Sequence, residues 1–244
     1  MKDIKLSKDI SKINLDLLSS DVNVYADDIR QPMVRYQGDF DVSYNNKTAI
    51  IKENGDKNST IIKNNIFNNI VIVNGNVTIN GQKMVNNVSG QKDVELILPR
   101  FSFSNTKIPV HNEKYNDITV QINSKSGDIG IKNLKLKKLI IDTLSGDVNL
   151  ENMILSKLMI KTLSGDMYLN DIDSLYSHLD SKSGDIDINI INSILNYEVL
   201  LKTLSGEAVQ KSIETSSPII LDTKNSLEAK TLSGDIKVLF KGKK

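Results

Sequence analysis

A tripeptide, Ser-Gly-Asp or Ser-Gly-Glu, recurs six times in the second half of the chain. The first four copies are spaced by 19 residues, and the last two follow at spacings of 22 and 28 residues. A fixed period of this length is typical of repeat proteins, in which each unit must stack on its neighbours to bury its apolar face. The copies are Ser126-Gly127-Asp128, Ser145-Gly146-Asp147, Ser164-Gly165-Asp166, Ser183-Gly184-Asp185, Ser205-Gly206-Glu207 and Ser233-Gly234-Asp235.

The residues on both sides of each glycine alternate between apolar and polar, which is the pattern of a half-buried β-strand. Ile141 and Thr143 precede one corner with one parity, and Val148 and Leu150 continue the same face after it. The sequence therefore predicts an all-β fold, a parallel β-helix (solenoid) with rungs of about 19 residues. The rungs are expected to stack about 4.8 Å apart in a right-handed coil.

The glycine and the acid of each copy are predicted to be structural turn residues. Glycine permits a positive φ at the corner, and the acid after it can accept hydrogen bonds from nearby backbone amides. The predicted turn residues are Gly127, Gly146, Gly165, Gly184, Gly206 and Gly234, with Asp128, Asp147, Asp166, Asp185, Glu207 and Asp235. The two larger spacings are interpreted as loops that bulge from the late rungs, one around residues 192–200 and one containing Ser216-Ser217-Pro218.

Residues 1–98 also have the pattern of β structure, but without the strict period. Ser19-Ser20-Asp21 is a degenerate copy of the corner, and Asn74-Gly75 lies between two apolar runs as in a two-residue hairpin. The Asn- and Lys-rich stretch near 53–69 is predicted to be a mobile loop. We therefore expect an irregular N-terminal β cap or first rungs over 1–98 and a regular solenoid over 99–244, as two units or one continuous domain.

Composition excludes several functions. Lys and Arg number 31 and Asp and Glu 30, so charge gives no argument for nucleic acid as a partner. The absence of Cys excludes disulfides, thiolate metal sites and cysteine nucleophiles. The chain has neither the apolar core of a signal peptide at its start nor a run of membrane-helix length. The expected location is the cytoplasm or the periphery of the cell envelope.

The acids of the corners should form a column of carboxylates up the stack. One interpretation is that each acid caps its own turn, and the other is that the column makes a row of cation sites. Calcium needs six to eight oxygen ligands, whereas one carboxylate per rung supplies few. We therefore expect turn capping, with no metal and no cofactor. A second column, Asp142, Lys161, Asp180 and Lys202, alternates in sign and predicts an ion-pair ladder on the outer surface.

Leucine stands immediately before the serine in four of the copies, at Leu144, Leu163, Leu204 and Leu232, and lysine replaces it at Lys125 and Lys182. Strand alternation places this column outside, because its parity is opposite to that of Ile141 and Thr143. Two interpretations remain open: an apolar corner that packs locally, or an exposed interaction stripe for a second copy or another partner.

The run Val94-Glu95-Leu96-Ile97-Leu98-Pro99, followed by units such as Ser-Lys-Ser-Gly-Asp-Ile and Thr-Leu-Ser-Gly-Asp-Val, resembles the bacterial "putative adhesin" domains of unknown function. The resemblance covers residues 94–240 well and 10–93 loosely, mainly through Leu17–Val24. It implies a β-helix and a connection with the bacterial cell envelope, often near envelope-stress regulators. It implies no catalytic residue.

These observations favour a non-catalytic structural or interaction protein that is adhesin-like and linked to the bacterial envelope or its stress response. Its partner would be a protein or an envelope component, with self-association as one form. The alternative is a carbohydrate-active β-helix enzyme, a polysaccharide lyase or hydrolase. Such enzymes need paired carboxylates or acids with Arg or Lys in a groove, whereas Arg occurs only at Arg30, Arg35 and Arg100.

Overall fold

The computed structural model describes residues 2–7, 9–27, 31–54, 70–73, 76–79, 82–84, 93–99, 118–213 and 224–242. These residues form a 16-stranded sheet, a separate 3-stranded sheet and one short 3₁₀ turn, η1 (Ile194–Asn196). The described part of the chain is therefore all-β. No helix in these ranges is long and apolar enough to cross a membrane. Of the loop predicted near 53–69, all but its first two residues lie outside the described residues.

The strands before residue 100 are β1 (Lys2–Lys5), β2 (Lys12–Leu17), β3 (Asp21–Asp27), β4 (Met33–Tyr36), β5 (Phe40–Asn45), β6 (Thr48–Glu53), β7 (Ile70–Val73), β8 (Asn76–Ile79), β9 (Gln82–Met84) and β10 (Asp93–Pro99). The later strands are β11 (Thr119–Ser124), β12 (Ile129–Ser145), β13 (Val148–Ser164), β14 (Met167–Ser183), β15 (Ile186–Ile190), β16 (Tyr197–Ser205), β17 (Ala208–Ser212), β18 (Asn225–Ser233) and β19 (Ile236–Phe240).

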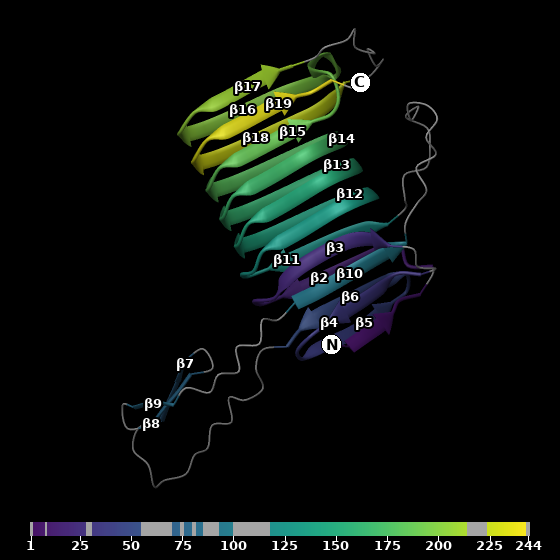
Figure 1. The fold of residues 1–244 in the computed structure, drawn as a ribbon, viewed down its shortest axis with the longest axis vertical. Helices are drawn as coiled ribbons and strands as arrows, with labels where there is room; N and C mark the ends of the chain where they lie inside the picture. Colours follow the sequence, from purple (N-terminus) through teal and green to yellow (C-terminus); the bar gives the residue numbers. More distant parts are fainter. Residues whose placement is uncertain are drawn as a thin grey trace.

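The central part of the large sheet is a stack of parallel strands, visible as the teal and green ribbons of Figure 1. β12, β13 and β14 lie in register, so that Ile129 pairs with Val148 and Val148 with Met167. Each of these strands turns part-way along, where Asn133, Asn152 and Asp171 adopt positive φ. Alternate side chains point inward, and Ile141, Val148 and Ile160 are at most 1% exposed. The core is thus a continuous apolar column inside the stack.

The late strands do not stack in the order of the chain. β14 pairs with β18, and β18 then pairs with β16; likewise β15 pairs with β19, and β19 with β17. The last unit, which consists of β18, the corner at Gly234 and β19, therefore lies between the corner at Gly184 and the corner at Gly206. Asn192, Ser193 and Asn196, in the segment interpreted as a bulging loop, are at most 4% exposed. Leu195 in the same segment is 53% exposed, so the segment packs only in part against the core, and Ser216-Ser217-Pro218 lies outside the described residues.

The degenerate corner of the N-terminal part extends the same stack. β2 pairs in parallel with β11, and β3 pairs in parallel with both β12 and β10. Beyond them the direction changes, because β5 is antiparallel to β6, and β4 is antiparallel to both β1 and β10. Residues on both sides of the expected boundary at 98/99 therefore share one sheet. In the small sheet, β7 and β8 pair as an antiparallel hairpin around positions 74–75, and the turn residues themselves are outside the described ranges.

Glu53 holds the degenerate corner in place. Its side chain is 2% exposed. Its Oε2 accepts backbone hydrogen bonds from Leu18 at 2.7 Å, Ser19 at 3.0 Å and Ser20 at 3.2 Å. Burial opposes ionisation, but the hydrogen bonds from the amides of Ser19 and Leu18 outweigh it and lower the pKa of the Glu53 carboxyl. A single carboxylate thus satisfies the amides of a corner that lacks the glycine of the later ones.

Candidate functional site

The corner glycines adopt the predicted backbone conformation. All six have positive φ, between 107° at Gly146 and 140° at Gly206. The corners also lie so close together that a side chain has no room. A Cβ added at Gly146 would lie 2.2 Å from the carbonyl oxygen of Gly127, and one at Gly165 would lie 2.3 Å from that of Gly146. Both the dihedral angle and the stacking therefore require glycine.

The acids of the corners form a ladder of backbone hydrogen bonds. The amide of each acid donates to Oδ1 of the acid on the neighbouring corner, for example from Asp166 to Asp147 at 2.9 Å and from Asp185 to Asp166 at 2.8 Å. The ladder begins at Asp21, whose Oδ1 accepts from Asp128 at 2.9 Å. It ends with the amide of Asp235 donating to Asp185 at 2.8 Å and that of Glu207 donating to Asp235 at 2.9 Å. Each acid therefore caps its neighbour rather than its own turn.

The ladder explains how the fold tolerates a row of negatively charged side chains that repel one another. An amide donor next to the carboxylate of each aspartate in the ladder offsets part of the repulsion between them, and hydrogen bonds to ionised acceptors are stronger than hydrogen bonds between neutral groups. Within the described ranges, no group of three or more His, Asp and Glu side chains is arranged to hold a metal ion.

The leucines before the corners are exposed, as their parity predicts. Leu144 is 51% exposed and Leu163 45%, whereas Thr143 beside them is 2% exposed. At the late corners Leu232 is 53% exposed and Leu204 82%. The described residues of the N-terminal region extend the stack at its end and leave these side chains uncovered. The interpretation of a locally packed corner is therefore wrong for the described structure.

The order of the strands groups the four leucines into two pairs. Leu144 lies beside Leu163, and Lys182 follows on the next strand. Because β18 is inserted, Leu232 comes next and Leu204 lies beside it at the end of the stack. We call Leu144, Leu163, Leu232 and Leu204 the leucine column. It presents apolar side chains on neighbouring strands, interrupted by one lysine.

The column of alternating charges is in register only in part. Asp142 pairs with Lys161 and Lys161 with Asp180, as predicted. The neighbour of Asp180 is Lys230, and Lys202 lies beside Lys230, so like charges meet at the last step. Lys230 forms its ion pair with Glu228, which also contacts Nδ1 of His178 at 2.8 Å. Among the residues that the structure describes, Asp142, Lys161 and Asp180 form no ion pair with one another, so the predicted ladder is wrong.

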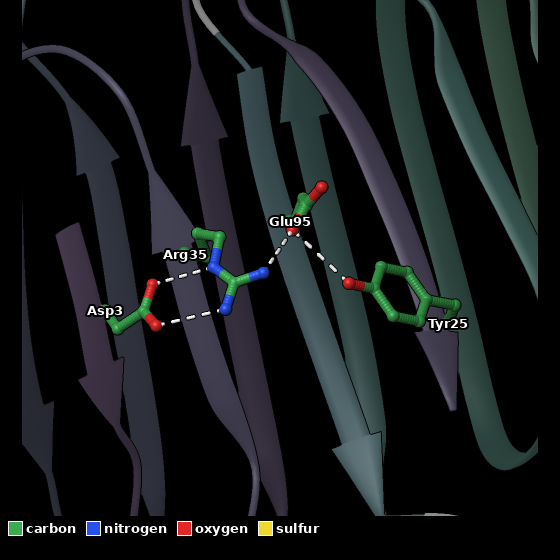
Figure 2. Close-up of polar contacts among 4 residues, drawn as sticks. All are labelled: Asp3, Tyr25, Arg35 and Glu95. Atoms are coloured by element: carbon green, nitrogen blue, oxygen red, sulfur yellow. Dashed lines mark hydrogen bonds and ion pairs between the residues drawn. The ribbon is translucent and has the colours of Figure 1, made fainter. Parts of the chain in front are cut away.

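A chain of polar contacts crosses four strands on the outer face of the sheet near its N-terminal end (Figure 2). Arg35 on β4 binds both carboxylate oxygens of Asp3 on β1, at 2.8 and 3.1 Å. Its Nη1 lies 3.4 Å from Oε2 of Glu95 on β10, which in turn accepts from the hydroxyl of Tyr25 on β3 at 3.3 Å. Burial and Glu95 together raise the pKa of Tyr25. The tyrosine hydroxyl is thereby fixed by a carboxylate that is itself held by an arginine.

Sequence reasoning missed this cluster and the contacts of Glu53. The partners are separated by 32 residues between Arg35 and Asp3 and by 70 between Tyr25 and Glu95. No periodic signal links such positions.

Comparisons with known proteins identify one family. Residues 4–243 match the family described as Toastrack DUF4097. Among solved structures, a "putative cell adhesion protein" from Clostridium sporogenes is 14% identical, with a TM-score of 0.41 and 98% of each chain covered. A "putative adhesin" from Bacteroides fragilis is 12% identical, with a TM-score of 0.46, and the match covers 98% of this chain and 95% of that one. No curated protein matches significantly.

Proposed function

The chain belongs to the Toastrack DUF4097 family, and we propose that it is a non-catalytic β-solenoid interaction protein, adhesin-like and associated with the bacterial cell envelope. The solenoid would have rungs of about 19 residues, in keeping with the register of β12, β13 and β14. Because residues 12–27 and 118–132 share one sheet, the N-terminal strands and the solenoid would be one continuous domain.

The observation that carries this proposal is the leucine column. Its side chains are 45–82% exposed on a rigid parallel stack. Stacked leucines on adjacent strands present more contiguous apolar surface than scattered ones, and such surfaces mark contacts with other proteins. Aliphatic side chains on a rigid backbone lose little entropy on binding, which favours association. We infer that the column is a protein-contact surface, and that a second copy of the chain is its occupant.

The test is the oligomeric state of the full chain. Leu144→Lys with Leu163→Lys should convert a self-associating protein into a monomer in sedimentation equilibrium. The equivalent position already holds lysine at Lys182, so the circular dichroism spectrum should not change. Leu195→Lys is the matched control, because Leu195 is 53% exposed but lies outside the column.

Two results would contradict the proposal. One is a wild-type chain that remains monomeric at the highest soluble concentration. The other is a folded double variant that associates as strongly as the wild type.

A further inference from the structure

A groove crosses the face of the sheet formed by the strand segments that follow the corners. It has a volume of about 370 Å³ and spans β3, β12, β13 and β14. Asn23, Gly130, Asn149 and Tyr168 occupy the same position on these four successive strands. At Gly130 the row of side chains is interrupted, and the groove lies there. It shares no residue with the leucine column, so a role for the groove is independent of the proposed function.

The backbone does not require glycine at position 130. Gly130 is not among the glycines with positive φ, and β12 pairs in unbroken register with β3 and β13 around it. An added Cβ would approach Oδ1 of the Asn23 side chain at 3.1 Å and no backbone atom closer than 3.8 Å. Glycine destabilises a strand interior, and in strands without a bulge or a bend it often stands where a ligand or another backbone approaches closely.

Tyrosine rings border the groove on its first and last strands, and both are fixed. Tyr25 on β3 is held by Glu95 at 3.3 Å, within the polar chain of Figure 2. The hydroxyl of Tyr168 on β14 donates to Oδ2 of Asp166 at 2.9 Å. The two tyrosines are three strand spacings apart, about 14 Å across the strands, and are offset by two residues along them. Rings held in place before binding reduce the entropy lost when a ligand stacks on them.

The polar side chains between the rings are available to a ligand. Asn23, Lys132, Asn149 and Glu151 all line the groove. Within the described ranges none of them forms a side-chain hydrogen bond or ion pair with another residue. They offer amide, ammonium and carboxylate groups, hence both donors and acceptors. One positive and one negative charge balance, which disfavours a strongly charged ligand such as a nucleic acid.

From this geometry we propose that the groove binds a short, uncharged oligosaccharide. A sugar ring has an apolar face that packs on tyrosine and a rim of hydroxyls that both donate and accept hydrogen bonds, which matches the two kinds of lining. Small-molecule sites combine aromatic walls with a few placed polar groups in the same way, and at comparable volumes. The groove is lined by one carboxylate, Glu151, whereas glycoside hydrolysis needs two, so it binds the sugar without cleaving it.

The test is titration of the full chain with maltotetraose, cellotetraose and chitotetraose, followed by calorimetry and saturation-transfer NMR. At least one should bind with a dissociation constant below about 1 mM. Gly130→Thr, which fills the groove with a residue that favours strands, should weaken binding about tenfold or more without lowering the melting temperature. Tyr168→Leu should weaken binding similarly, and Tyr44→Leu, at a tyrosine that is 50% exposed outside the groove, should not.

Three outcomes would overturn the proposal. None of the tetrasaccharides binds; or binding survives both Gly130→Thr and Tyr168→Leu; or a charged oligogalacturonate binds more tightly than every neutral sugar. The double variant of the leucine column should bind sugar as the wild type does, so failure at either surface is distinguishable from failure at the other.

Discussion

Replacing Gly165 by alanine tests the corner geometry in the middle of the stack. Its φ of 130° lies in a region that alanine rarely adopts, which costs about 1–3 kcal/mol. The new Cβ would lie 2.3 Å from the carbonyl oxygen of Gly146 and 2.8 Å from its carbon. Those atoms belong to the backbone of the neighbouring corner and cannot rotate aside, so the two corners must separate.

Separation of these two corners weakens the rung of the acid ladder that joins them. That rung is the hydrogen bond from the amide of Asp166 to Oδ1 of Asp147. Its loss adds about 0.5–1.5 kcal/mol. The expected total is a loss of about 1.5–4.5 kcal/mol in the free energy of unfolding.

The assay is urea unfolding of the full chain, followed by far-UV circular dichroism. Gly130→Ala is the matched control, because the same substitution there meets no positive φ and no close backbone atom. It should stabilise the fold by about 0.5–1 kcal/mol. A loss of less than about 1 kcal/mol at Gly165 would refute the account of why glycine is required at the corners.

Two further predictions concern the buried carboxylate of Glu53 and the column of acids at the corners. Glu53→Gln should lower stability at neutral pH by about 1.5–3 kcal/mol, because the glutamine cannot serve three amides as an ionised acceptor. Since folding lowers the pKa of Glu53, its contribution is complete above the ordinary value of 4.5 and is lost as the pH falls through the lowered pKa. Melting curves of wild type and variant should therefore converge in acid, and an equal gap at every pH would argue against this role. Calcium should not change the melting temperature, because the aspartates of the ladder each already accept a hydrogen bond from a backbone amide and the column supplies one acid per corner. A calcium-dependent rise that Asp147→Asn with Asp166→Asn abolishes would show instead that the column binds cations.

Strand parity made much of the surface predictable. Thr143 and Leu144 are neighbours in sequence, yet one is 2% and the other 51% exposed, because alternation sends successive side chains to opposite faces. The corner at Gly146 was also predictable. Its positive φ and its close stacking both require glycine, so the same tripeptide recurs at each corner and can be read from the sequence.

The order of the late strands could not be predicted in the same way. The corners at Gly184, Gly206 and Gly234 have nearly the same sequence, so the sequence does not indicate which of them stacks on which. Which one follows Gly184 depends on packing between distant segments, as Asp187 pairs with Lys237 rather than with a residue of β17. The groove could not be predicted either, because Asn23 and Gly130 meet only once β3 lies beside β12. The right-handed coil stays a prediction.

Cross-linking tests the strand order on which the leucine column depends. The chain contains no cysteine, so a pair can be introduced without interference. Asp187→Cys with Lys237→Cys places two thiols on adjacent parallel strands, about 4.8 Å apart along the stack. Asp187→Cys with Val209→Cys places them two strands apart, because β19 lies between β15 and β17. The structure predicts rapid oxidative cross-linking of the first pair and little of the second; efficient cross-linking of the second pair alone would show that the rungs stack in chain order and would contradict the account.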